Sequence, residues 1–256
     1  MRNSVVIDCF QENPEIRRHE CAVVAIDVIR ATTTAITAAA TGRRCFPVPS
    51  TDAGLELQRQ LPGSLLAGET AGEVPQGFDL NNSPAEIATR KDVHRPLILL
   101  SSSGTKLIHA ASGCEYTYLA CFRTWLSVAE YLIDRHHNVA LIGAGTRGEF
   151  REEDQLCCAW IARELINAGY QPEDHRTSVI VDRWASATAE ACLCSKSVEY
   201  LRKSGQTRDL EFTLQHVNDL PAVFGMRNGE VVLASTAATA ACGAMVSYSC
   251  SSLSSL

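Results

Sequence analysis

The sequence predicts an α/β fold, and three observations lead to that prediction. Short apolar runs alternate with amphipathic stretches along most of the chain, as strands and helices do in α/β domains. The 256 residues are 46% hydrophobic and 20% charged, enough apolar material for a large buried core. No clear domain break precedes residue 175. We expect one α/β domain over residues 1–234, with a subdomain boundary near 175 and an Ala/Ser-rich tail over 235–256.

The first two thirds of the chain predict the clearest elements. Short, continuous apolar runs indicate buried strands. We expect these strands at 4–10, 21–27, 44–48, 64–67, 97–101, 116–120 and 138–142. Helical stretches follow most of them, and Gly42 and Gly169 mark two helix ends. We expect these helices at 30–41, 52–60, 105–111, 124–135 and 152–168.

The last third of the chain predicts fewer regular elements. We expect a strand at 178–182, helices at 185–203 and 206–215, and a last strand at 230–233. The tail beyond Ser235 has few large side chains, so we expect it to fray or to need a partner. Burial of this region would favour a homodimer.

Composition excludes several classes of function. The chain has 23 Lys and Arg against 29 Asp and Glu, a net charge of −6, and no basic run that would bind nucleic acid. No stretch of 18 apolar residues predicts a membrane span, and the first residues are too polar for a signal peptide. Eleven cysteines, odd in number and without a Cys-x-x-Cys spacing, indicate reduced thiols and a cytoplasmic location.

The first candidate site follows the strand at 21–27. Asp27 ends this strand, where open α/β sheets bind ligands and where a carboxylate could hold Mg²⁺. Arg30 and the threonines at 32–34 open the next helix, whose free N–H groups and positive end suit a phosphate or carboxylate. The alternative is a polar turn with a threonine cap.

The second candidate site is the irregular loop over 68–84. Such long loops in compact domains are usually functional or disordered. Glu69 follows a short strand, and Asp79 lies within the loop. Their carboxylates, with nearby amide oxygens, would suit Mg²⁺ rather than zinc. Ser83 and Pro84 predict a helix cap and first helical residue. The alternative is a solvated loop.

Two further strand-to-helix turns are rich in small residues. The turn at 101–105 (SSSGT) would form a second anion nest or a plain helix cap. The turn at 143–148 (GAGTRG) matches G-x-G-x-x-G, but three acidic residues at 152–154 follow where a pyrophosphate would rest. A dinucleotide site is therefore excluded. Those acids suit either the helix dipole or a Mg²⁺ ion that faces a phosphate.

Five strings, in this order, resemble the 2-phosphosulfolactate phosphatase (ComB) family. They are AIDVIRATTT (25–34), LLAGE (65–69), GFDLNNSP (77–84), SSSGT (101–105) and GAGTRGEFREED (143–154). A weaker match, LPAVFGMRNGEV (220–231), falls where the family's chain nears its end. The chain departs from the family's usual pattern at Asn81, where glycine is usual, and at Ser103, where asparagine is frequent.

The resemblance implies a ComB-like three-layer α/β/α fold with a mixed, largely parallel sheet. It implies Mg²⁺-dependent hydrolysis of 2-phospho-3-sulfolactate to 3-sulfolactate and phosphate, and a place in coenzyme M biosynthesis. The runner-up function is a Mg²⁺ phosphatase for another 2-phospho-hydroxy acid, such as phospholactate. A non-catalytic binder of anionic metabolites is the alternative from another class.

The motifs and the resemblance together yield a set of expected site residues. We expect catalytic roles for Asp27, Arg30 and Glu69. We expect substrate contacts from Arg30, Thr32, Thr33, Thr34, Asn82, Ser83, Ser103, Gly104, Thr105, Arg123, Gly145, Thr146 and Arg147. We expect Mg²⁺ to be held among Asp27, Glu69, Asp79, Glu152, Glu153 and Asp154. The substrate would be a small anionic phosphate ester.

Overall fold

The computed structural model describes residues 2–10, 21–145 and 149–236. Its strands are β1 (Ser4–Cys9), β2 (Ala22–Ile26), β3 (Cys45–Val48), β4 (Leu65–Gly68), β5 (Leu97–Leu100), β6 (Tyr116–Ala120), β7 (Asn138–Gly143), β8 (Gln171–Pro172), β9 (Ala222–Arg227) and β10 (Glu230–Thr236). Its α-helices are α1 (Ala31–Ala40), α2 (Thr51–Gln60), α3 (Pro84–Thr89), α4 (Gly104–Ala111), α5 (Trp125–Leu132), α6 (Glu152–Asn167), α7 (His175–Trp184), α8 (Lys196–Lys203) and α9 (Thr207–Gln215). A 3₁₀ helix, η1 (Ala189–Cys194), precedes α8.

Within the described residues the strands form one ten-stranded sheet in the order β4-β5-β3-β10-β9-β6-β2-β7-β1-β8. Two blocks of parallel strands make up most of it: β4, β5 and β3 form one, and β6, β2, β7, β1 and β8 form the other. The hairpin of β9 and β10 joins the two blocks by antiparallel pairing to β6 and β3. The sheet is therefore mixed but mostly parallel.

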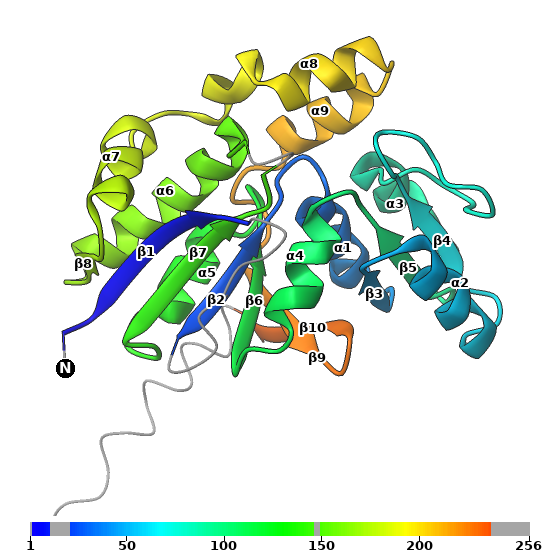
Figure 1. Cartoon of the computed structure of the whole chain (residues 1–256), viewed down its shortest axis with the longest axis horizontal. Helices are drawn as coiled ribbons and strands as arrows, with labels where there is room; N and C mark the ends of the chain where they lie inside the picture. Colours follow the sequence, from blue (N-terminus) through cyan, green and yellow to red (C-terminus); the bar gives the residue numbers. More distant parts are fainter. Residues whose placement is uncertain (1, 11–20, 146–148, 237–256) are drawn as a thin grey trace, which may run out of the picture.

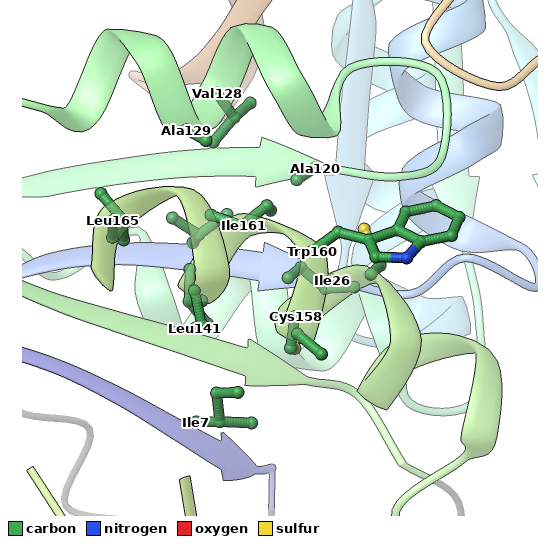
Figure 2. Packing of buried hydrophobic residues seen from close by; sticks show 14 of the residues in the cluster. Ile7, Ile26, Ala120, Val128, Ala129, Leu141, Cys158, Trp160, Ile161 and Leu165 are labelled. Atoms are coloured by element: carbon green, nitrogen blue, oxygen red, sulfur yellow. The ribbon is translucent and has the colours of Figure 1, made fainter. Parts of the chain in front are cut away.

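Helices cover both faces of this sheet, as Figure 1 shows. On one face, α5, α6 and α7 pack on the block that contains β2. Side chains of β2 alternate accordingly, because Val24 and Ile26 face these helices whereas Val23 and Ala25 face the opposite layer. Figure 2 shows the first layer, in which Ile161 of α6 lies over Leu141 of β7. The expected three-layer α/β/α fold is confirmed.

The helices α1 and α4 form the layer on the opposite face. Each contacts strands of both parallel blocks: α1 touches β3 and β6, and α4 touches β2 and β3. In Figure 1 they stand between the two blocks. Because both blocks pack on the same two helices, strand ends that are distant in the sheet order can meet at one cavity.

The last third of the chain differs most from the sequence prediction. The expected strand at 178–182 lies inside helix α7, whose cap is Asp174, accepting a hydrogen bond from the Thr177 N–H. The apolar run at 178–182 led to the wrong prediction of a buried strand. Ile180 is buried but Val179 is 49% exposed, so only one face of this segment is buried, as in an amphipathic helix.

Two further elements differ in this region. The helix expected at 185–203 is interrupted, because Ser195 ends η1 and caps α8 through its side chain. Strand β9 was not predicted, and β10 extends to Thr236, two residues into the expected tail. The remainder of the tail, 237–256, lies outside the described residues. No helix in the described part is long and apolar enough to span a membrane.

Candidate active site

One cavity of about 940 Å³ lies where β2, β3, β4, β5 and β7 end. Helix α8 contributes a further wall. The polar side chains that line it are Asp27, Arg30, Ser50, Thr51, Glu69, Thr70, Asn82, Ser101, Ser102, Ser103, Lys106, Arg151, Glu153, Asp154, Lys196, Ser197 and Tyr200. Among the described residues, four cationic and four carboxylate side chains therefore line this cavity. It lies at the strand ends, where α/β sheets bind ligands.

Asp27 lies at the end of β2 and is 8% exposed. Burial, followed by the charges of Glu69 and Glu153, raises the pKa of Asp27 from its ordinary value of 3.8 to about 7. A backbone hydrogen bond from Ala31 and the charge of Arg30 oppose this rise. The Asp27 carboxyl group is thus a buried acid that a nearby cation would hold in its ionised form.

Gly104, the first residue of α4, allows the Asp27 carboxylate to lie directly against this helix. A Cβ atom at position 104 would overlap the Asp27 Oδ2 atom and the Ala31 Cβ atom. Only glycine therefore fits here. The carboxylate of Asp27 lies at the positive end of α4, which favours its charged form.

The threonines of α1 serve the backbone. The Thr32 hydroxyl lies 2.8 Å from the carbonyl oxygens of Asp27 and Ala120, and it accepts a hydrogen bond from the Asp27 N–H. The Thr33 and Thr34 hydroxyls donate to the carbonyls of Val28 and Arg30. All three threonines are buried, and none lines the cavity. This placement does not support the expected contacts with phosphate, and instead gives them a role in fixing the turn after β2.

Arg30 lies in the cavity wall with its guanidinium held from α9. Its Nη1 atom is 2.6 Å from Asp209 Oδ2, and both side chains are 4% exposed. Nη1 also donates to Gln206 Oε1, and Nη2 donates to Asn81 Oδ1 at 3.3 Å. The peptide bond that precedes Arg30 is cis. These partners fix the direction of the guanidinium.

Asp209 and Gln206 were not found from the sequence, because no motif surrounds them. The second oxygen of Asp209 accepts hydrogen bonds from the Ser83 hydroxyl at 2.5 Å and from the Ala85 N–H at 3.2 Å. Ser83 also accepts from the Glu86 N–H as the predicted cap of α3, which begins at Pro84 as expected. Asp209 therefore connects Arg30 to the start of α3.

The loop after β4 contributes Glu69 and Asn82 to the cavity. Glu69 accepts hydrogen bonds from the Ser102 N–H and hydroxyl and from the Gly72 N–H, at 2.7 to 2.8 Å. Asn82 is 2% exposed, and its Oδ1 atom has no hydrogen-bond partner in the described part of the chain. Asp79 does not line the cavity, because its carboxylate accepts from the Leu66 N–H beside β4. The expected role of Asp79 in metal binding is not supported by this position.

The first turn of α6 places two acids in the cavity wall. Glu153 and Asp154 are 1% and 3% exposed, and burial raises the pKa of each carboxyl group. Asp154 Oδ1 accepts from the Val28 N–H at 2.9 Å, and its pKa is raised further by the charges of Asp27 and Glu153. Glu152, the third acid of this turn, does not line the cavity.

These carboxylates fit an open Mg²⁺ site better than a closed metal cage. No group of three or more His, Cys, Asp or Glu side chains in the described ranges converges on one point. Mg²⁺, however, is commonly held by one or two carboxylates, waters and substrate phosphate. The Glu153 Oε2 atom is buried without a hydrogen-bond partner among the described residues. A buried, unpartnered carboxylate oxygen beside two other raised-pKa acids is suited to a divalent cation.

The turn at 101–105 lies against the same cavity. Ser103 lines it and makes no side-chain cap bond to α4, although it precedes that helix. Thr105 is buried and does not line the cavity, because its side chain and its N–H both bond to Ser101. Lys106 lines the cavity from the first turn of α4, and the sequence analysis did not single it out.

The turn after β7 brings Gly145 to the cavity, with a φ of 58°. A Cβ atom there would lie 2.6 Å from Cys9 Sγ, so glycine is required. Thr146 and Arg147 lie outside the described residues. Arg123 is not at the cavity, because it pairs with Asp219 through two hydrogen bonds of 2.8 and 3.0 Å. Its expected contact with substrate is not supported by this position.

The cysteines in the described ranges are all free thiols, and none forms a disulfide, as the sequence predicted.

The fold and the cavity together define an α/β protein with a cavity of mixed charge at the ends of its parallel strands.

Comparisons with known proteins agree with this class. A model of the 2-phosphosulpholactate phosphatase family matches residues 8–229. The chain belongs to this family of phosphoric monoester hydrolases, which confirms the resemblance found in the sequence.

Several curated relatives carry the name probable 2-phosphosulfolactate phosphatase. The protein of Pseudothermotoga lettingae is 38% identical over 156 residues, 61% of this chain and 66% of that protein. The protein of Thermotoga maritima is 31% identical over 195 residues, 75% of this chain and 84% of that protein. The protein of Clostridium perfringens strain SM101 is 28% identical over 239 residues, 90% of this chain and 96% of that protein.

Proposed function

We propose that this chain hydrolyses 2-phospho-3-sulfolactate to 3-sulfolactate and phosphate in a Mg²⁺-dependent reaction. Membership of the family supports the reaction, and the names of the relatives support the substrate. The observation that carries the proposal is the shared wall of the cavity, in which Asp27, Glu69, Glu153 and Asp154 lie with four cationic side chains.

The charges of this wall support a role for a divalent cation. The substrate would bring a phosphate, a carboxylate and a sulfonate into a cavity that already holds four carboxylates. Arg30 offsets little of this charge, because the buried Asp209 pairs with it. A binder of anions needs only cations and N–H groups, whereas carboxylates beside an anion are favourable only with a metal or with bound protons. The carboxylates therefore favour a Mg²⁺ enzyme over a non-catalytic binder.

Asp27, Glu153 and Asp154 are the residues that would hold Mg²⁺, with Glu69 close enough for its charge to raise the pKa of Asp27. When bound, Mg²⁺ would neutralise charge on the phosphoryl oxygens and lower the pKa of a bound water. This ligand set omits Asp79 and Glu152, which do not line the cavity.

The other residues of the wall would position the phosphate. Arg30 would donate hydrogen bonds to phosphate oxygens in a direction fixed by Asp209 and Gln206. Lys106 and the N-terminus of α4, beside Ser103, would add positive charge on the side of Asp27. Phosphoryl transfer depends mainly on such positioning and charge neutralisation. Asp27 would act either as a metal ligand or as the group that attacks phosphorus.

Phosphate release from racemic phosphosulfolactate, with and without Mg²⁺ and with phospholactate in parallel, tests the proposal. Mg²⁺-dependent release that favours the sulfonated substrate would support the reaction, the metal and the substrate together. Equal rates on phospholactate would support the phosphatase but contradict the specific substrate. No release from either compound, with binding still detectable, would support the anion binder instead. The cytoplasmic location, the homodimer, the lack of a nucleic-acid partner and the link to coenzyme M biosynthesis stay predictions.

A further inference from the structure

Two cations at the cavity are held together by one carboxylate. Arg151 precedes α6 and Lys196 begins α8, and both line the cavity. Glu149 accepts from Lys196 Nζ at 2.7 Å on both oxygens, and from Arg151 Nη1 at 2.9 Å. Glu149 itself does not line the cavity. One negative charge thus holds two positive charges close together, and the group of three keeps a net positive charge.

The two cations retain donors for a ligand. The Arg151 side chain is 15% exposed, and its Nε atom is buried without a hydrogen-bond partner among the described residues. An unpaired buried donor is costly unless a ligand pairs with it. Lys196 is 65% exposed, so it lies at the open side of the cavity, whereas Glu153 and Asp154 are almost fully buried. Lys196 therefore lies nearer the surface of the molecule than the two acids that would hold the metal.

We propose that Arg151 and Lys196 hold the sulfonate of the substrate and so select sulfonated over unsulfonated 2-phospho acids. This inference rests on the proposed function. The sequence predicted substrate contacts from Arg123 and Arg147; Arg123 does not line the cavity, and Arg147 lies outside the described residues. A sulfonate is always ionised near neutral pH and carries three equivalent oxygens around sulfur. It can therefore accept hydrogen bonds from an arginine that precedes α6 and from a lysine that begins α8.

The test compares two substrates in the full-length enzyme with Mg²⁺. For Arg151→Gln and for Lys196→Gln, kcat/KM is measured on phosphosulfolactate and on phospholactate, which lacks only the sulfonate. We expect the ratio of the two kcat/KM values to fall by about 10- to 100-fold, the usual effect of a lost hydrogen bond to a charged group. A merely structural defect would lower both values equally and leave the ratio unchanged.

Lys203→Gln is the matched control on the same helix. Lys203 is 73% exposed, pairs with Glu199 and does not line the cavity, so the ratio should stay at its wild-type value. Calorimetric binding of 3-sulfolactate and of lactate to the same variants provides a second readout that does not need turnover. We expect both site variants to weaken the binding of 3-sulfolactate and to leave any lactate binding unchanged.

The outcomes separate this inference from the proposed function. If the wild-type protein hydrolyses neither substrate but binds 3-sulfolactate, the proposed reaction fails, and a loss of that binding in the variants still supports the subsite. An unchanged selectivity ratio in an active enzyme overturns the subsite and leaves the phosphatase intact. A wild-type protein that neither hydrolyses phosphosulfolactate nor binds 3-sulfolactate overturns both.

Discussion

Arg30 and Asp209 form a buried ion pair of 2.6 Å although 179 positions separate them in the chain. Arg30 comes from the turn after β2, and Asp209 comes from helix α9. Asp209 also accepts a hydrogen bond from the Ser83 hydroxyl, at the start of α3. One carboxylate of α9 therefore connects two turns that line the cavity or border it.

Removal of the Asp209 carboxylate should destabilise the protein strongly. Asp209→Ala leaves Arg30 buried without its counter-charge, which usually costs about 3–5 kcal/mol of unfolding free energy. Chemical denaturation measures this loss. Glu230→Gln is the control, because Glu230 pairs with the exposed Arg44 and should cost less than about 1 kcal/mol. Similar small losses in both variants would show that the buried pair contributes little.

A side chain at position 104 should disturb the Asp27 carboxylate. Gly104→Ala would place a methyl group where Asp27 Oδ2 lies, so we expect a loss of activity together with about 1–3 kcal/mol of stability. Gly113→Ala, after the same helix, is the control, because its nearest neighbour would be the Ala110 carbonyl oxygen at 3.8 Å. Phosphate release and thermal unfolding measure the two effects. Full activity in Gly104→Ala would show that Asp27 can move without consequence.

Asp27→Asn should lower kcat by roughly 10²- to 10⁴-fold, the usual range for a group that acts on a proton or nucleophile. The substitution keeps the shape of the side chain but removes the charge that a cation or phosphorus would meet. Asp79→Asn is the comparison, because the Asp79 carboxylate lies outside the cavity, and we expect its kcat to stay near that of the wild type.

Two measurements then define the role of Asp27. A phosphoenzyme trapped by rapid acid quench in the wild type but not in Asp27→Asn would show that Asp27 attacks phosphorus. Its absence in the wild type, with Mg²⁺-dependent turnover, would leave the metal-ligand role. A change in Asp27→Asn that is confined to KM would contradict both roles.

Stability in the absence of metal should fall as the pH rises from about 4 to about 7. The pKa of Asp27 is raised by burial to about 7 in the folded protein, from its ordinary 3.8. Between these values the folded state binds a proton that the unfolded state does not, so deprotonation at higher pH costs stability. The raised pKa values of Glu153 and Asp154 act in the same direction.

Mg²⁺ should reverse this trend, because it binds the deprotonated carboxylates. The increase in Tm on addition of Mg²⁺ should therefore be larger at about pH 8 than at about pH 5. Differential scanning calorimetry across this pH range measures both effects, with Ca²⁺ as a comparison ion. An increase in Tm that does not depend on pH would argue against Mg²⁺ binding at these acids.

Local patterns predicted much of the fold correctly. Ser83 caps α3 and Pro84 begins it, because capping depends on neighbouring backbone groups that the sequence places directly. The strands and helices up to residue 169 were found because a buried strand needs a continuous apolar run and an amphipathic helix needs a periodic one. At 178–182 the apolar run belongs to the buried face of helix α7, so the prediction of a strand from a continuous apolar run was wrong there.

The residues of the cavity were predicted in part, because the ends of parallel strands meet at one edge of the sheet. Asp27, Glu69 and Gly145 lie just after strand ends, and Asp154 lies in the first turn of the helix that follows β7. Because the strand ends of this sheet meet, the proximity of these residues followed from their positions along the chain. The direction of a side chain does not follow from position. Thr32 turns its hydroxyl to the backbone, and no pattern in the sequence indicates this.

The sequence by itself determined the alternation of strands and helices up to residue 169, the cap of α3 at Ser83 and the acids that follow the strand ends. The tertiary structure alone decided that β9 and β10 join the two parallel blocks, that Asp209 pairs with Arg30, and that Lys196 meets Arg151 through Glu149. Each of these relationships joins residues far apart in the chain. They depend on how whole layers pack, and local periodicity, propensity and spacing carry no information about that packing.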